Sequence, residues 1–230
     1  MRRALATVLG AVLITGVLAE DSMAREVRPP ERAAAVALPA PRLDGGAALE
    51  RALAERRSVR EFARGALTLP QVAQLLWAAQ GVTQRDGART APSAGALYPL
   101  ELYLVAGAVR ELAPGVYRYV PGKHQLEPVA AGDLSRQLCA AALAQECVAA
   151  GAAVFVFTAV ERRTTRKYGP RGVRYVHIEV GHAAQNLALQ ATALGLGSVT
   201  VGAFDDAAVA RLLQLPAGEA PLYLMPVGLR

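Results

Sequence analysis

The feature that most constrains the fold of this chain is an unbroken apolar segment in its second half. Residues 152–160 carry no charge, and Thr158 is their only polar side chain. A strand with one face in water alternates apolar and polar residues, whereas an unbroken apolar strand is buried on both faces. We therefore expect residues 152–160 to form a strand inside a central sheet that is flanked by helices.

The remaining segments predict an α+β order of helices and strands around that sheet. Thr68 caps a helix, with Pro70 in its first turn and Gln71 three residues after the cap, and Gly81 ends it. Further helices are expected at about 46–57, 133–149 and 205–215, with a long helix that ends near Leu194. Strands are expected at 100–105, 198–201 and 222–227, and a hairpin joins 115–120 to 125–129. Residues 161–172 are expected to form a polar loop.

The length of 230 residues suits one domain with a terminal extension. Hydrophobic residues make up 53% of the chain and aromatic residues only 5%, which favours a helix-rich domain built with much alanine. Residues 20–45 contain four prolines that interrupt any periodic pattern, at positions 29, 30, 39 and 41. We interpret 20–45 as a linker and 46–230 as the folded domain.

The first 19 residues have the organisation of an export signal. Arg2 and Arg3 precede an uncharged run from Ala4 to Ala19, whose last residues are small enough for a signal peptidase. This run is short for a membrane span, which needs about 20 apolar residues. The pattern predicts a signal peptide and a periplasmic or exported protein. An uncleaved anchor in the inner membrane and a cytoplasmic protein are the alternatives.

Charge and cysteine content exclude two other classes of function. The formal net charge is +6, and without residues 1–19 it falls to +4, with 23 basic and 19 acidic residues. This dispersed excess is too small to indicate nucleic-acid binding. Cys139 and Cys147 lie about 12 Å apart on one predicted helix, beyond disulfide reach, and with three scattered histidines they form no metal-ligand pattern. We expect two buried thiols and no metal site.

A local cluster of arginines is the first candidate for a binding site. Arg56, Arg57 and Arg60 surround Ser58, and only Glu61 opposes their charge. The planar fork of donors on each arginine matches the oxygens of a phosphate group. A phosphate site is therefore one interpretation of the cluster, and a basic surface patch is the other.

Two segments of small residues are further candidates. Residues 91–99, Ala-Pro-Ser-Ala-Gly-Ala-Leu-Tyr-Pro, allow a close approach of the backbone to a flat ligand. Residues 197–206, Gly-Ser-Val-Thr-Val-Gly-Ala-Phe-Asp-Asp, lead into a capped helix with free backbone amides. Each segment alone is also compatible with an ordinary turn.

Together, and in this order, these motifs resemble the FMN-dependent nitroreductase superfamily, and within it the SagB/ThcOx-type dehydrogenases that include azoline oxidases. The resemblance covers residues 46–230, roughly 80% of the chain. It rests on the three segments above and on four others: Gly115-Val-Tyr-Arg-Tyr119, Lys167-Tyr-Gly-Pro-Arg-Gly172, Glu179-Val-Gly-His-Ala-Ala-Gln-Asn-Leu187 and Gly195-Leu-Gly197. It implies a nitroreductase-like fold with a mixed, mainly antiparallel sheet, in an obligate homodimer.

The resemblance also implies two FMN molecules at the dimer interface, each contacted by both chains. Arg56, Arg57, Ser58 and Arg60 match the segment that holds the phosphate, the ribityl chain and part of the ring. Ser93, Gly95 and Ala96 match the loop that reaches the flavin across the interface, and Thr200, Val201, Gly202 and Ala203 match the segment along the ring. Arg230 is the one basic residue at the C-terminal end of the sequence that can meet the phosphate.

Lys167 and Tyr168 match a pair that, in azoline oxidases, assists removal of a substrate proton. A lysine can act as a base near neutral pH when burial or cationic neighbours lower its pKa. Neighbouring arginines supply such charges, at positions 162, 163, 166 and 171. A solvated basic loop is the alternative. His182 is expected to be a packed, hydrogen-bonded residue, and Glu179 and Gln185 are expected to bond each other or the backbone.

The sequence thus predicts an FMN-dependent oxidoreductase that transfers a hydride between an organic substrate and the flavin, with azoline-type heterocycle oxidation as one form of that reaction. The substrate is expected to be a small molecule or a modified peptide. An NAD(P)H-dependent nitro or quinone reductase is the alternative enzyme. A flavin-binding partner protein without efficient turnover of its own is the alternative outside enzymes.

Overall fold

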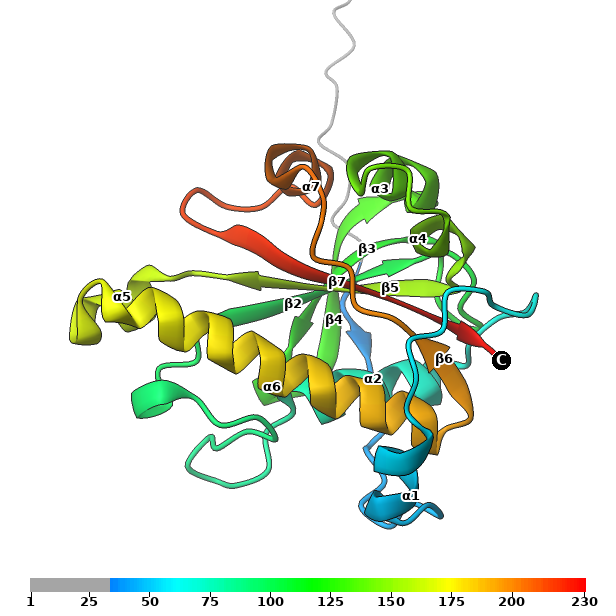
Figure 1. Cartoon of the computed structure of the whole chain (residues 1–230), viewed down its shortest axis with the longest axis horizontal. Coiled ribbons are helices and arrows are strands. Elements are labelled where there is room, and N and C mark those ends of the chain that lie inside the picture. The colour runs from blue at the N-terminus through cyan, green and yellow to red at the C-terminus, as the bar shows by residue number, and fades with distance from the viewer. Residues whose placement is uncertain (1–33) are drawn as a thin grey trace, which may run out of the picture. The chain divides into compact units, whose positions relative to one another are not determined.

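The computed structural model describes residues 34–230, and the expected export segment lies outside them. One seven-stranded sheet runs through the domain in the order β1-β4-β3-β2-β5-β7-β6, and every pair of neighbouring strands is antiparallel (Figure 1). The strands are β1 (Val36–Ala37), β2 (Leu100–Ala106), β3 (Gly115–Val120), β4 (Gln125–Ala131), β5 (Ala153–Ala159), β6 (Leu196–Ser198) and β7 (Ala220–Leu229). The expected α+β fold around one sheet is confirmed. The interval expected to be a linker contributes β1.

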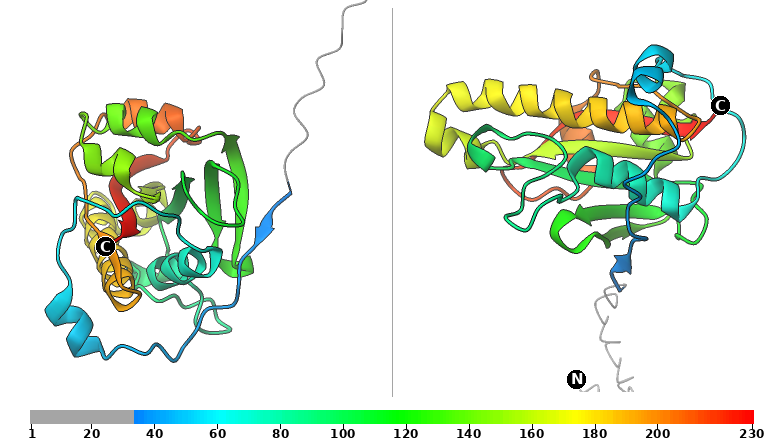
Figure 2. Two further views of the ribbon diagram at one scale, coloured as in Figure 1. Left: turned by 90° about the vertical axis from the view of Figure 1, so that its right-hand side faces the viewer. Right: turned by 90° about the horizontal axis from the view of Figure 1, so that it is seen from below.

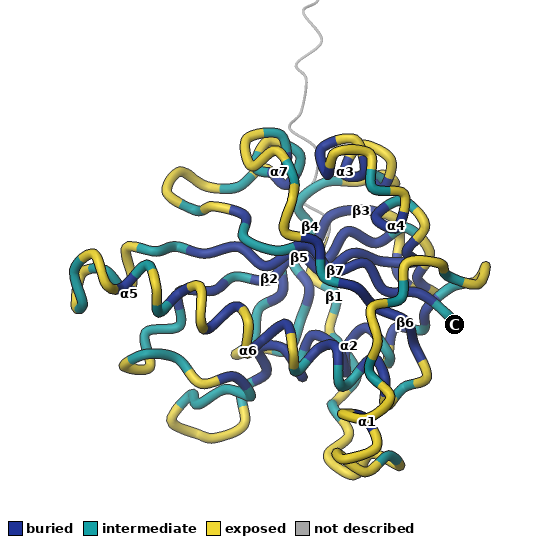
Figure 3. Tube along the Cα trace, in the orientation of Figure 1, coloured by how far each residue is buried: buried dark blue, intermediate teal, exposed yellow. Residues whose placement is uncertain are grey.

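Strand β5 lies inside the sheet, as its unbroken apolar sequence predicts. It pairs with β2 on one side and β7 on the other, and all seven of its residues are buried. Phe155 and Phe157 point into the larger hydrophobic core, while Val154 and Val156 point into the smaller core on the opposite face. Both faces of the sheet are therefore covered, and the buried strands form its centre (Figure 3).

Helices α2 (Leu69–Gln80) and α6 (Arg171–Ala193) cover the face that carries the larger core (Figure 2). The Thr68 side chain and Gln71 form the expected capping box, and Gly81 follows the last turn of α2. Helix α6 ends just before Gly195, whose φ of 72° is a left-handed conformation that glycine adopts without cost. The predicted start and end of α2 and the predicted end of α6 are confirmed. The short helix α1 (Leu49–Glu55) packs against α6.

The opposite face is covered by α3 (Ser135–Ala141), α4 (Glu146–Ala150) and α7 (Asp206–Leu212). The single helix expected over 133–149 is wrong, because Leu143 and Ala144 adopt φ values of 56° and 57° and separate α3 from α4. Cys139 and Cys147 therefore lie on different helices. Both are buried and unbridged, as expected for packed thiols.

The polar loop expected at 161–172 is also wrong. Residues Arg162–Tyr168 form helix α5, and Gly169, with φ of 58°, turns the chain directly into α6. Only Thr164 of α5 is buried, so the helix has no apolar stripe that a sequence pattern can reveal. Strand β6 also ends earlier than predicted, at Ser198, and Val201 returns to the sheet through a single bridge to Leu224.

Within residues 34–230, no helix combines the length and the apolar character that crossing a membrane requires.

Candidate functional site

A cavity of about 170 Å³ brings together two of the three segments that the sequence singles out. Arg56 and Ser58 form one part of its wall, and Ser198, Val199 and Thr200 form another. Helix α6 and strand β7 complete the lining with Gly181, Ala184, Gln185, Ala188, Tyr223 and Met225. Segments that are about 140 residues apart in the sequence thus share one site.

Backbone contacts explain why these segments meet. Ser58 forms a parallel bridge with Ser198, and the Val59 amide donates to the Ser198 carbonyl at 2.9 Å. A methyl group on Gly197 would lie 2.8 Å from Val59 Cγ1, so the absence of a side chain at Gly197 lets the arginine segment lie against β6. On the other wall, Gly181, Ala184 and Ala188 recur at helical spacing and give α6 a shallow surface.

The other two arginines of the cluster do not line the cavity within one chain. Arg57 Nη1 donates to the carbonyl oxygens of Ala54 at 3.0 Å and Arg56 at 2.7 Å, so its guanidinium covers the end of α1. Arg60 is exposed, and its charge partly opposes the rise that burial causes in the pKa of the Cys147 thiol. Of the three arginines, only Arg56 lines the cavity.

The residues that follow β6 lie partly in the cavity wall and partly outside it. Thr200 lines the cavity, and Val201 is fixed by two backbone hydrogen bonds with Leu224, at 2.8 and 3.0 Å. Gly202 and Ala203 are exposed beyond the cavity. Arg230 is exposed at the end of β7 and is not part of the wall. Tyr223 and Met225 line the cavity but carry no sequence signal that separates them from ordinary strand residues.

The loop of residues 92–99 lies at a different place along α6. Ser93 Oγ lies 2.6 Å from Glu179 Oε2, and the Tyr98 amide donates to Ser93 Oγ at 2.9 Å. Glu179 precedes Gly181 of the cavity wall by two residues and Ala188 by nine, but no residue of the 92–99 loop is among those that line the cavity. Within one chain, therefore, Ser93, Gly95 and Ala96 do not reach the cavity of Arg56 and Thr200.

Lys167 and Tyr168 lie beside that same loop. A methyl group on Gly95 would be 2.7 Å from Tyr168 Oη and 3.0 Å from Lys167 Nζ, so both side chains rest on the bare backbone of Gly95. The Tyr168 ring packs edge-on against Tyr175, with ring centroids 5.1 Å apart. Lys167 is exposed and Tyr168 is half-buried. The pair is thus presented at the surface, at the C-terminal end of α5.

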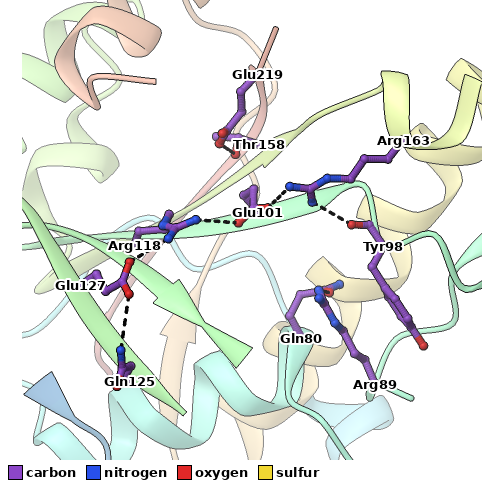
Figure 4. Close-up of polar contacts among 10 residues, drawn as sticks. All are labelled: Gln80, Arg89, Tyr98, Glu101, Arg118, Gln125, Glu127, Thr158, Arg163 and Glu219. Carbon is purple, nitrogen blue, oxygen red and sulfur yellow. Dashed lines mark hydrogen bonds and ion pairs between the residues drawn. The ribbon is translucent and has the colours of Figure 1, made fainter. Parts of the chain in front are cut away.

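Tyr98 is the point at which several elements hold the 92–99 loop (Figure 4). Arg163 of α5 donates from Nη1 to the Tyr98 carbonyl at 3.0 Å and from Nη2 to Glu101 Oε1 at 2.6 Å. The guanidinium of Arg89 lies 4.4 Å from the centre of the Tyr98 ring. These contacts stabilise a residue with φ of 44°, a conformation that costs a non-glycine residue about 1–2 kcal/mol.

Two expectations about α6 are revised by the structure. Glu179 bonds Ser93 rather than Gln185, and burial raises the pKa of the Glu179 carboxyl, while the Ser93 hydrogen bond and the charge of Arg89 partly oppose that shift. His182 is exposed in the single chain rather than packed. It lines a second cavity, of about 270 Å³, together with Pro92, Ser93, Ala94, Tyr175, Ile178 and Glu179.

Comparison with known proteins identifies the family. The Nitroreductase family matches residues 53–229. This chain belongs to the nitroreductase family. A protein of Methanocaldococcus jannaschii that is named as a nitroreductase is 48% identical over 180 residues, covering 78% of this chain and 90% of the relative. A nitroreductase-like structure from Ralstonia eutropha has a TM-score of 0.73 at 30% identity, covering 86% of this chain and 90% of that one.

Similarity also extends to a microcin-processing protein and to a microcin synthetase complex. The microcin B17-processing protein McbC of Escherichia coli is 30% identical over 147 residues, which are 61% of this chain and 54% of McbC. A second similar structure is one chain of the Escherichia coli McbBCD microcin synthetase, solved with truncated pro-MccB17 bound. Its TM-score is 0.65 at 26% identity, and the match covers 77% of the present chain and 71% of the synthetase chain. The predicted family, with SagB-like relatives, is confirmed. The chain spans about half the length of McbC.

Proposed function

We propose that this protein is an FMN-dependent oxidoreductase of the SagB/ThcOx type. The observation that carries the proposal is the cavity that joins Arg56 and Ser58 to Thr200 across the small residues of α6. Its chemistry fits FMN: a guanidinium and a hydroxyl suit the phosphate, and a wall of glycine and alanine suits a flat ring. The chain belongs to the nitroreductase family, whose members are oxidoreductases, and this supports the reaction class.

The site is proposed to be completed by a second copy of the chain. The cavity of one chain, about 170 Å³, is smaller than the roughly 300–1,000 Å³ typical of ligand pockets. In the same chain, no residue of the 92–99 loop lines this cavity. We propose that, in a two-fold dimer with α6 packed against its copy, the partner's loop would complete this cavity. Ser93, Gly95 and Ala96 would then contact the flavin in trans, as the family resemblance implies.

Lys167 and Tyr168 are proposed as the catalytic pair. Bound FMN supplies hydride transfer to or from carbon. Because Lys167 Nζ and Tyr168 Oη both rest on Gly95, the loop that approaches the flavin carries the proton-transferring groups with it. Lys167 would hold or accept the substrate proton, and Tyr168 would orient it. Arg57, Arg60, Gly202, Ala203 and Arg230 remain predicted cofactor contacts that a closed dimer would have to recruit.

Two kinds of substrate fit the proposal. Similarity to McbC and to the McbBCD synthetase, which was solved with truncated pro-MccB17 bound, favours oxidation of an azoline-type ring in a modified peptide, with partner proteins. The exposed position of Lys167 leaves room for a peptide-sized substrate. The nitroreductase name of the M. jannaschii relative favours the second candidate, reduction of a nitro or quinone compound by NAD(P)H.

We also propose that residues 1–19 direct export. A reporter enzyme fused after Ala19 would test this, because its activity should then be found outside the cytoplasm.

The test combines the spectrum of the bound cofactor with one matched pair of variants. We expect the purified protein to be yellow and to release FMN on denaturation. Lys167→Ala should keep the flavin spectrum and lose dehydrogenase turnover by about 10²–10⁴-fold, the usual contribution of a general base. Lys123→Ala is the control, because Lys123 is exposed in the turn between β3 and β4.

Three outcomes decide between the candidate functions. A colourless protein that acquires no spectrum with added FMN would refute the cofactor. Equal loss of flavin and turnover in Lys167→Ala would make the lysine structural. Rapid bleaching of the flavin by NADH without oxygen, followed by turnover of a nitroaromatic compound, would favour the reductase over the dehydrogenase.

A further inference from the structure

The carboxyl group of Glu179 is buried with too few donors for a carboxylate. Its residue is 3% exposed, and Oε1 has no hydrogen-bond partner among the described residues. Oε2 has one partner, the Ser93 hydroxyl at 2.6 Å. An ionised carboxylate in a protein interior needs several donors or a paired cation, because the charge loses its hydration.

No cation within residues 34–230 forms an ion pair with that carboxyl group. Arg89 is the charged group whose field reaches Glu179, and it forms no ion pair with the carboxylate within 4 Å. Its guanidinium is engaged elsewhere, at 2.8 Å from Gln80 Oε1 and over the Tyr98 ring. On α6, Tyr175 and His182 flank Glu179 and line the same cavity, and neither donates to it. Burial raises the pKa of Glu179, in agreement with this geometry.

The protonation state of Glu179 decides what the Ser93 hydroxyl can do. A serine hydroxyl has one hydrogen to donate and two lone pairs. One lone pair already accepts from the Tyr98 amide. If Glu179 is ionised, Ser93 must give its only hydrogen to Oε2. If Glu179 is neutral, it donates to Ser93 Oγ, which then accepts two bonds and keeps its own hydrogen for a third group.

We propose that Glu179 is a positioning residue that is protonated in the folded protein at pH 6 and thereby frees the Ser93 hydroxyl to donate to the ligand of the 92–99 loop. The inference rests on the proposed function, in which this loop lies against the flavin, whose ring oxygens and nitrogens accept hydrogen bonds. The free hydrogen has space, because Ser93 lines the cavity of about 270 Å³ beside α6. Glu179 is proposed to act on the ligand through Ser93.

A pH dependence of known sign follows. A carboxyl whose pKa is raised on folding is neutral below that raised pKa and ionises as the pH rises through it. Ionisation withdraws the Ser93 hydrogen from the ligand. FMN affinity should therefore fall as the pH rises, by about fivefold, the factor that corresponds to one ordinary hydrogen bond.

Glutamine at position 179 separates this role from simple packing, because its amide donates like a neutral carboxyl and cannot ionise. We expect Glu179→Gln to match the wild-type Kd for FMN at pH 6 and to keep that Kd at pH 9, where the wild type weakens. Ser93→Ala should bind FMN weakly at both pH values and remove the dependence. Wild type and Glu179→Gln with parallel pH profiles would overturn the inference.

A second measurement needs no flavin. The infrared difference spectrum between the flavin-free wild type and flavin-free Glu179→Gln at pH 6 should contain the carbonyl band of a protonated carboxyl. A carboxylate band instead would overturn the inference even if FMN binds as proposed. Protein that binds no FMN but shows the protonated carboxyl would refute the proposed function and uphold the protonation of Glu179.

Discussion

At the scale of single residues, Gly95 is where the loop and the proposed catalytic pair meet. Its φ of 65° is left-handed, and its missing side chain leaves the space that Tyr168 Oη and Lys167 Nζ occupy. A methyl group there would displace both side chains. We expect Gly95→Ala to lower turnover at least as far as it lowers FMN affinity.

Backbone strain alone would also follow from alanine at a left-handed position, at about 1–2 kcal/mol. Gly87→Ala is therefore the matched control, since Gly87 has φ of 89° and a methyl group added there would have no atom within 4 Å. Thermal unfolding of both variants should show similar destabilisation, while kcat should fall in Gly95→Ala alone. Equal kcat values in the two variants would mean that Lys167 and Tyr168 do not depend on this contact.

At the scale of elements, Arg163 fastens α5 to the loop and to strand β2. Its two donors reach the Tyr98 carbonyl and the Glu101 carboxylate, whose side chain is 14% exposed. Lysine cannot make both bonds with the same geometry. We expect Arg163→Lys to speed amide hydrogen exchange in residues 92–99 and 162–168 by about fivefold, which corresponds to about 1 kcal/mol.

Global stability should change little in Arg163→Lys, because the arginine is 41% exposed and such pairs contribute at most about 1 kcal/mol. Arg166→Lys is the control: Arg166 lies on the same helix, is exposed and makes no ion pair among the described residues. If amide exchange in residues 92–99 stays slow in Arg163→Lys, the contacts of Ser93 and Arg89, rather than those of Arg163, hold the loop in place.

The elements differ in how far the sequence could predict them. Helix α2 could be predicted because its cap, its apolar stripe and its terminal glycine lie within 14 residues. Helix α5 could not, because it buries only Thr164 and its ends are fixed by contacts with a loop about 65 residues away. The break between α3 and α4 falls at Leu143 and Ala144, residue types that favour helices, so tertiary packing rather than propensity decides their conformation.

Some residues of the candidate site could likewise be predicted from the sequence, and others could not. Residue types identified Arg56, Ser58 and Thr200, since guanidinium, hydroxyl and small-residue patterns imply a ligand. Glu179 and Ser93 are 86 residues apart, so their hydrogen bond depends on how α6 crosses the sheet and leaves no local pattern. The placement of Arg57 against the end of α1 is likewise a matter of side-chain conformation, which the sequence leaves open.

At the scale of the whole molecule, the exposed apolar residues concentrate where a second copy is proposed to dock. Ile178 on α6 is 50% exposed, and Leu49 and Leu53 on α1, which packs on α6, are 61% and 52% exposed. Figure 3 shows the exposed run of α1 beside the partly exposed length of α6. A two-fold interface uses the same patch on both chains, so each of these residues would be buried in both copies.

Ile178→Glu tests this arrangement and the shared site together. Burial of an isoleucine side chain contributes about 1.5–3 kcal/mol. In a two-fold interface the variant would lose this contribution once in each chain, and it would also bury one glutamate charge from each chain. We expect the variant to be a folded monomer by light scattering and to have lost FMN with its partner. Leu143→Glu is the control: Leu143 is 65% exposed between α3 and α4, on the opposite face of the sheet, so that variant should stay a yellow dimer. A monomeric Ile178→Glu that keeps FMN would mean that one chain closes the cavity, and Ser93, which does not line that cavity in its own chain, would then not contact the cofactor.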